Sequence, residues 1–151
     1  MGKFLFINHS TWGKIILDRN FFVLVVATVV LFIVYLGYKE STVIIDSTAF
    51  RLRGGLYRVN IPFAEISKID TIAWSEVPAF IRTNGISLFL VHRGHFKTTY
   101  GDKLHLSIKS GVSPVIKIID QQGTVYYINH KNSDKTRLVF KELNTLLIGN
   151  S

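Results

Sequence analysis

The chain of 151 residues contains no cysteine. This absence excludes disulfide bridges, thiolate-bound metals and a cysteine nucleophile, and it is compatible with a cytoplasmic domain. Acidic residues are also few, with ten Asp and Glu against 18 Lys and Arg, so the formal net charge is +8. Because the ten are scattered, the paired carboxylates that general acid–base catalysis uses are missing.

Sequence signatures of catalysis and of nucleotide binding are lacking as well. No serine lies in a G-x-S-x-G elbow, no P-loop is present, and no G-x-G-x-x-G follows a strand pattern. Lys and Arg are spread through the strand patterns and do not cluster on one helix or loop, which argues against nucleic-acid binding. We therefore expect no catalytic activity, no cofactor and no nucleic-acid partner.

One long apolar run, "FFVLVVATVVLFIVYLG", extends from Phe21 to Gly37 and carries no charge. A bilayer core takes about 20 apolar residues, with a lower limit of about 17. A buried core helix is an alternative, but such a helix is rarely apolar on all faces; a cleaved signal peptide is another, but no A-x-A pattern follows the run. The run predicts a transmembrane helix over 21–38, with Trp12 and Tyr38 near its interfaces.

This helix would divide the chain into an N-terminal juxtamembrane segment (1–20), the transmembrane helix (21–38) and a domain (39–151). Basic residues near the run are almost balanced, with three before it and four closely after it: Lys3, Lys14, Arg19, then Lys39, Arg51, Arg53 and Arg58. The slight excess after the run favours a cytoplasmic C-terminal domain. We expect a single-pass protein of the bacterial inner membrane.

After Tyr38 the sequence changes to the period of two that is typical of strands. "AFRLR" places Phe50 and Leu52 on one face and Arg51 and Arg53 on the other, before a turn at "GG". Further strand patterns follow in "RVNIP", "AEISKIDTIAW", "ISLFLV", "KTTY", "KLHLSIK", "VIKIID" and "TVYYINH". Their spacing predicts an antiparallel meander.

The last segment has helical spacing instead. Asn132 or Ser133 can cap this helix, and Asp134 suits the helix dipole in the first turn. Its apolar residues form one stripe that must be buried: Val139, Phe140, Leu143, Leu146 and Leu147. The predicted fold is mainly β with one N-terminal transmembrane helix, and about seven strands form a bent sheet or partly open barrel that the C-terminal helix caps.

Seven strands followed by one capping helix resemble the pleckstrin-homology (PH) superfold. "YRVNIPFAEISKI" is similar to the "IPY-x-EI-x-x-I" segment of bacterial PH-like domains, which are often attached to transmembrane helices, and "INHKNSDKT" is similar to the stretch that opens their helix. The resemblance covers about residues 40–147. The resemblance implies no shared activity, because function belongs to sites and not to folds. We expect an interaction or scaffold module that acts at the membrane surface.

Three arginines near the first predicted turn are candidates for contact with an anionic membrane surface: Arg51, Arg53 and Arg58. If their strands return towards the headgroups, each would contribute roughly 1 kcal/mol on anionic lipid. "RLRGGLYR" loosely resembles the region that holds phosphoinositide headgroups in eukaryotic PH domains. The alternative is an ordinary charged outer face of a strand pair.

The irregular segment "IAWSEVPAFIRTNG" is a candidate for contact with a protein partner or for self-association. Apolar residues in a loop can anchor an interface, and this segment has five: Trp74, Val77, Pro78, Phe80 and Ile81. The alternative is a lid that folds back over the end of the sheet. Strand addition at a sheet edge near Pro62 is a second way to bind a partner.

Three histidines, His92, His95 and His105, raise the possibility of a zinc site. Residues three apart in a strand point to opposite faces, however, and Arg93 would repel a dication. We expect no metal, and instead an exposed basic hairpin tip with its turn at Gly94: His92, Arg93, His95 and Lys97. A sensor of anionic headgroups or of a small ligand is the alternative function, and an enzyme of unknown class is a weaker one.

Overall fold

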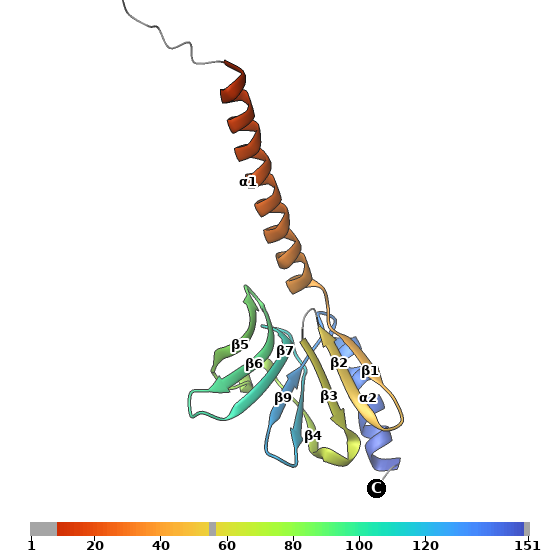
Figure 1. Ribbon diagram of the computed structural model, residues 1–151. Coiled ribbons are helices and arrows are strands. Elements are labelled where there is room, and N and C mark those ends of the chain that lie inside the picture. Colours follow the sequence, from red (N-terminus) through yellow and green to blue (C-terminus); the bar gives the residue numbers. More distant parts are fainter. Residues whose placement is uncertain (1–8, 55–56, 150–151) are drawn as a thin grey trace, which may run out of the picture. The chain divides into compact units, whose positions relative to one another are not determined.

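The computed structural model describes residues 9–54 and 57–149, and within helix α1 it describes the side chains of residues 19–35. The chain divides into two compact units, Met1–Leu36 and Gly37–Ser151. Helix α1 spans His9–Tyr38 (Figure 1). The predicted juxtamembrane segment falls largely outside the residues whose side chains are described, and the boundaries of the three segments, 1–20, 21–38 and 39–151, stay a prediction.

The apolar run that predicted a transmembrane helix forms part of α1. Within the described residues, no helix combines the length and the apolar character that crossing a membrane requires. The predicted transmembrane helix over 21–38 is therefore wrong. The single-pass arrangement and the inner-membrane location were inferred from this helix, so the same finding contradicts them. The side chains of Trp12 and Tyr38, expected at the interfaces, lie outside the described residues.

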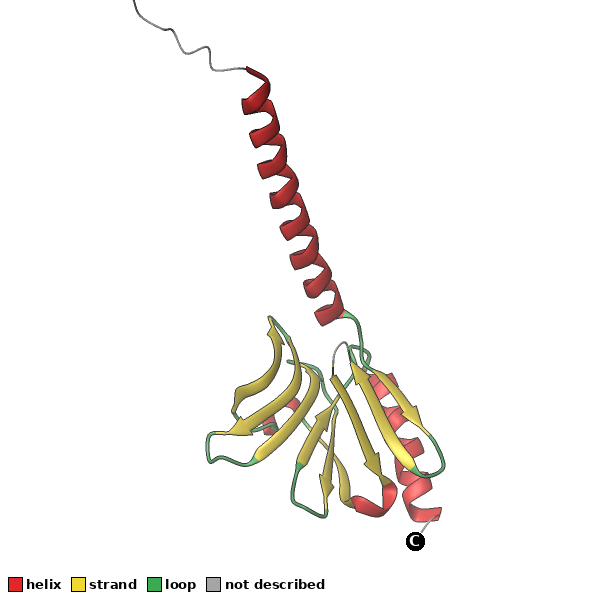
Figure 2. Cartoon of the chain, viewed as in Figure 1, coloured by secondary structure: helices red, strands yellow, loops and turns green. Residues whose placement is uncertain are grey.

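The second unit contains nine strands, two 3-10 helices and helix α2 in its described part (Figures 1 and 2). Their bounds are β1 Thr42–Ile45, β2 Ala49–Gly54, β3 Tyr57–Pro62, η1 Phe63–Glu65, β4 Ile66–Ile72, η2 Trp74–Glu76, β5 Phe80–Leu88, β6 Val91–Thr98, β7 Lys103–Lys109, β8 Val115–Asp120, β9 Val125–Ile128 and α2 Ser133–Gly149. The strands form a three-stranded sheet, β1-β2-β3, and a six-stranded sheet, β4-β8-β9-β7-β6-β5.

The mainly β character and the C-terminal helix are confirmed, but the single seven-stranded bent sheet or partly open barrel is wrong. The β8–β9 hairpin inserts between β4 and β7, so that β9 pairs with β7 in parallel while the other pairs are antiparallel. Alternating side chains predict that a strand exists but not which strand it pairs with. The spatial order therefore departs from the meander that the spacing predicted.

Helix α2 closes the larger hydrophobic core, as its predicted apolar stripe required. The core joins the helix to both sheets through Phe50, Leu52, Ile61, Phe63, Ile116, Ile118, Ile128, Val139 and Leu143. Phe140, Leu146 and Leu147 pack against the same cluster. Asn132 caps the helix, because its Oδ1 accepts a hydrogen bond from the N–H of Asp134 at 2.8 Å. Figure 2 shows α2 behind the three-stranded sheet.

The two sheets lie against each other at Gly94 of β6. A Cβ atom built there would be 2.6 Å from the carbonyl oxygen of Asn84, 2.7 Å from Gly85 Cα and 2.8 Å from Tyr57 Cε1. Gly85 is the residue opposite Gly94 on β5, and Tyr57 comes from β3 of the other sheet. Since φ of Gly94 is +114°, both space and backbone conformation require glycine.

We predict that Gly94→Ala destabilises the fold more than Gly101→Ala does. Gly101 has a similar φ of +100°, but a Cβ there meets nothing within 4 Å. Strain alone costs about 1–3 kcal/mol, and overpacking at Gly94 adds roughly 1–3 kcal/mol. Urea unfolding of both variants measures the difference, and equal losses would contradict the close packing of the sheets at Gly94.

Candidate functional site: a pocket beside the turn between β5 and β6

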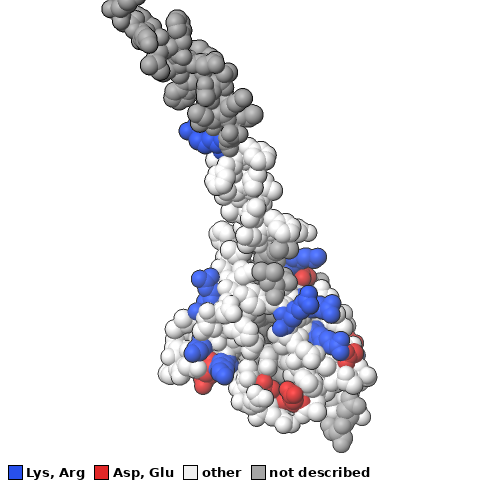
Figure 3. All heavy atoms as spheres, in the orientation of Figure 1, with Lys and Arg blue, Asp and Glu red and all other residues white. Residues whose placement is uncertain are grey.

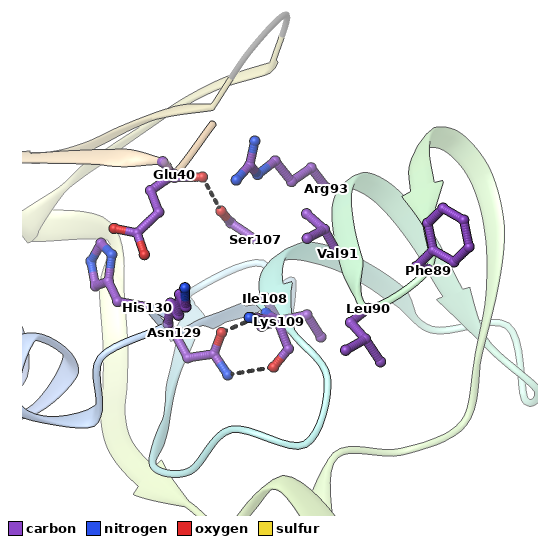
Figure 4. Close-up of a pocket in the computed structure, with 12 residues that line it drawn as sticks. Glu40, Phe89, Leu90, Val91, Arg93, Ser107, Ile108, Lys109, Asn129 and His130 are labelled. Atoms are coloured by element: carbon purple, nitrogen blue, oxygen red, sulfur yellow. Dashed lines mark hydrogen bonds between the residues drawn. The ribbon is translucent and has the colours of Figure 1, made fainter. Parts of the chain in front are cut away.

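A pocket of about 310 Å³ opens beside the turn between β5 and β6 (Figure 4). Its polar lining comes from the segment before β1, from β6 and β7, and from the chain after β9: Glu40, Ser41, Arg93, Ser107, Lys109, Asn129, His130 and Lys131. Its apolar lining comes from the turn and the adjoining strands: Phe89, Leu90, Val91 and Ile108. Residues distant in sequence thus meet around one cavity.

Arg93 lies inside the protein, which corrects the predicted exposed basic hairpin tip. Leu88 pairs with Val91, so the hairpin turns at Phe89 and Leu90 and not at Gly94. Within the predicted tip, His92 is half-buried and Arg93 is only 7% exposed, while His95 and Lys97 are exposed. The turn was predicted at Gly94 and not at Phe89 because the φ of Phe89 is 47°, a conformation that aromatic residues rarely adopt.

The pocket holds more positive than negative charge. Burial lowers the pKa of Arg93 and the Glu40 carboxylate opposes this effect, but a guanidinium stays protonated in proteins. Burial acts to raise the pKa of Glu40, but the hydrogen bond and charge of Lys135, the nearby His130 and the Lys131 N–H together hold it below its ordinary value. Glu40 Oε2 lies 3.4 Å from Lys135 Nζ. Glu40 is the one carboxylate among the described lining residues, whereas Arg93, Lys109 and Lys131 are cationic.

His130 contributes a buried imidazole that is only 2% exposed. Its backbone N–H donates to Thr136 Oγ1 at 3.0 Å, whereas its Nε2 has no hydrogen-bond partner among the described residues. Such an unsatisfied buried group costs about 1–3 kcal/mol. Burial and the charge of Lys135 lower the pKa of His130, against the opposing effect of Glu40, so the ring is neutral at pH 7 and can donate or accept a hydrogen bond.

Other polar groups of the lining hold the walls of the pocket together. Asn129 Oδ1 accepts from the N–H of Lys109 at 2.6 Å, and Nδ2 donates to the carbonyl oxygens of Lys109 at 3.0 Å and Val112 at 2.8 Å. The Oγ atoms of Ser41 and Ser107, 2.6 Å apart, connect the segment before β1 to β7. Asn129 is therefore a structural clamp, because its amide is occupied by backbone groups.

The three arginines predicted to face lipid lie together and exposed on the three-stranded sheet. Arg53 stands directly opposite Arg58, and Arg51 stands opposite Asn60. Arg51 also forms an ion pair with Asp46 at 2.9 Å. Figure 3 shows basic side chains gathered over this sheet. The structure supports their grouping on one face, while their contact with anionic lipid stays a prediction.

The segment predicted to contact a partner packs mostly against its own domain. Trp74, Val77 and Phe80 lie against the second hydrophobic cluster, which is formed by Phe96, Leu104, Leu106, Ile108, Val115 and Tyr127. Pro78 is half-buried, and Ile81 is 59% exposed. This arrangement is the folded-back lid that the sequence offered as the alternative, and binding of a partner at Ile81 stays a prediction.

The fold separates His92 from the other two histidines that were considered for a metal. His92 hydrogen-bonds Ser87 at 2.7 Å and Ser110 at 2.9 Å, whereas the rings of His95 and His105 lie 4.2 Å apart. Burial and the neighbouring His95 lower the pKa of His105 to about 4, against an opposing effect of Asp120. Across residues 9–54 and 57–149, no group of three or more His, Asp or Glu residues is placed to hold a metal ion.

We predict that the free energy of unfolding falls as the pH drops from about 6.5 towards 4. His105 has a folded-state pKa of about 4, and burial also lowers the pKa values of His92 and His130. The unfolded chain, whose histidines titrate near 6.5, therefore binds more protons in this window. Urea unfolding at pH 7, 5.5 and 4.5 measures the loss, which His105→Gln should reduce and Lys103→Gln on the same strand should not. An unchanged pH dependence in His105→Gln would contradict the assignment.

No single local motif marks the pocket in the sequence. Glu40 lies three residues after the apolar run, and His130 lies two residues after the last strand. Their proximity depends on the parallel β7–β9 pairing that the meander did not include. No family model matches this chain, and no curated protein and no solved structure is significantly similar to it. The resemblance to PH-like domains therefore stays a prediction, and the geometry of the pocket is the basis for inferring function.

Proposed function

We propose that this protein is a binding module for a small ligand that carries an anionic group, and that the pocket beside Arg93 is the site. The observation that carries the proposal is the guanidinium charge of Arg93, 7% exposed, in the lining of a cavity of about 310 Å³. Guanidinium is planar and matches the oxygens of carboxylate or phosphate. A charge in such surroundings attracts an anion more strongly than the same charge in water.

The rest of the lining supports the same ligand chemistry. Lys109 and Lys131 add positive charge, and the imidazole of His130 supplies a further polar group. Because Glu40 is paired with Lys135, its carboxylate is partly neutralised. Clefts lined by charge of one sign concentrate ligands of the opposite sign. The proposal develops the small-ligand alternative that the sequence left open and moves its site from the predicted arginine face to the interior.

The arrangement favours binding over catalysis. A serine nucleophile needs a base within hydrogen-bond reach, but Ser41 and Ser107 bond to each other. The Nε2 atom of His130 has no hydrogen-bond partner in the part of the chain that the structure describes. A binding role without chemistry is therefore the function that these contacts support best.

A second candidate is anion binding on the outer face of the three-stranded sheet. Arg53 and Arg58 are exposed and directly opposite each other, and like charges in such a pair destabilise a sheet. An anion between them would relieve the repulsion. Arg58→Glu removes this site without touching the pocket beside Arg93, so the two candidates can be separated.

We predict that full-length protein binds inorganic phosphate and acetate, and that the Lys109→Glu/Lys131→Glu variant binds both at least tenfold more weakly. Tenfold corresponds to about 1.4 kcal/mol, a modest loss for reversing two charges beside a bound anion. The matched control is Lys97→Glu/Lys103→Glu, which reverses a facing pair of exposed lysines at the other end of the β6–β7 hairpin.

Isothermal titration at low ionic strength measures the affinities, and circular dichroism confirms folding of each variant. The control pair and Arg58→Glu are expected to stay within twofold of wild type. Equal losses of affinity in both double-lysine variants would mean that only the net charge of the protein matters, and they would refute the pocket as the binding site. A loss confined to Arg58→Glu would assign binding to the outer face.

A further inference from the structure

We propose that the ligand is amphipathic, with an anionic head towards Arg93 and His130 and an apolar body against the turn of Phe89 and Leu90. This inference rests on the proposed anion-binding function and deepens it. The shared chemistry is a carboxylate or phosphate joined to a short alkyl or aryl group. Figure 4 shows Phe89 and Leu90 on one side of the cavity and His130 and Glu40 on the other.

Phe89 combines two unfavourable features at one position. Its φ is 47°, the single positive value for a non-glycine residue in residues 9–54 and 57–149, and its side chain is 84% exposed. Glycine or asparagine would adopt this conformation with less strain and would leave no aromatic ring in water. Strained residues of this kind cluster at ligand sites, where a contact offsets their cost.

The turn that carries Phe89 is held in place by the neighbouring strand. The N–H of Ser110 donates to the carbonyl oxygen of Leu90 at 2.7 Å, and the ring of His92 hydrogen-bonds Ser87 on β5 and Ser110 after β7. Phe89 and Leu90 are therefore presented by a braced hairpin. A pre-positioned wall binds a ligand with a smaller ordering cost than a loop that must first be fixed.

The apolar wall is continuous from the surface to the core. Leu90 is exposed, whereas the next two lining residues, Val91 and Ile108, are buried. A small polar anion at Arg93 would leave this wall in water. An apolar body on the same ligand would cover it, and affinity rises with the apolar area removed from water. The two walls thus fit the two parts of one amphipathic molecule.

Tyr100 offers a matched comparison within the same sheet. It is 94% exposed and lies at the turn between β6 and β7, at the other end of the hairpin strands. It is another highly exposed aromatic residue, but it has no positive φ and does not line the pocket. An effect of generic aromatic surface would appear at Tyr100 as well as at Phe89.

The test compares probes that share a head and differ in the body. Isothermal titration of the full-length protein uses acetate against octanoate and inorganic phosphate against octyl phosphate, with octylamine as a cationic amphipath. We expect each amphipathic anion to bind at least tenfold more tightly than its head alone, and octylamine not to compete. The affinity ratio within each pair measures the contribution of the apolar body. Comparison of the two pairs shows whether the site prefers a carboxylate or a phosphate head.

The decisive variants are Phe89→Asn and Tyr100→Asn. We expect Phe89→Asn to lower the octanoate-to-acetate affinity ratio at least tenfold while its melting temperature stays equal or rises, because asparagine relieves the strain. Tyr100→Asn is expected to leave the ratio unchanged. An unchanged ratio in Phe89→Asn, or equal losses in both variants, would overturn the inference.

The two proposals fail in different ways. If phosphate and acetate bind and depend on Lys109 and Lys131, but octanoate binds no more tightly than acetate, the amphipathic inference fails and the anion site stands. If octanoate binding depends on Phe89 but not on the two lysines, and octylamine competes, the site is apolar and the anion proposal fails. If none of the probes binds, both proposals fail.

Discussion

The close approach of the two sheets at Gly94 is the constraint on which the rest of the domain depends. A Cβ atom on Gly94 would lie only 2.8 Å from Cε1 of Tyr57 on β3. The ring of Tyr57 therefore packs directly against the backbone of β6 at Gly94. Arg93, the preceding residue, is consequently enclosed. Gly54 makes room on the other sheet, since a Cβ there would lie 2.5 Å from Ser41 Oγ and 3.2 Å from Arg93 Cδ. Glycines thus allow a charged side chain to be buried between sheets.

Burial of Arg93 gives the pocket its character. A cation in low-dielectric surroundings is costly on its own, and the cost is recovered only when opposite charge or polar groups are close. Glu40 supplies part of that charge but is shared with Lys135, and His130 has its pKa lowered by burial. The proposed anion site rests on this buried charge together with Lys109 and Lys131 in the lining. The braced turn of Phe89 adds the apolar wall, so in the proposed complex the head and the body of the ligand contact the same hairpin.

Patterns within one element could be predicted from the sequence, but pairings between elements could not. The alternation of "AFRLR" put Arg51 and Arg53 outside, and the cap at Asn132 and the stripe of α2 were predicted correctly. The parallel β7–β9 pair was missed because periodicity carries no information on partners. The hairpin tip was misplaced because an aromatic residue occupies a turn position that normally favours glycine, and the pocket was missed for both reasons.

The most direct test of the anion site is a proton–nitrogen NMR titration of the full-length protein with inorganic phosphate, following the Arg Nε–H signals. We predict that the Arg93 signal moves saturably and that the His130 ring signals move with the same affinity, while the signal of Arg58 on the outer sheet face stays fixed. A shift of the Arg58 signal with an unchanged Arg93 signal would refute the proposed site and place the anion outside the pocket.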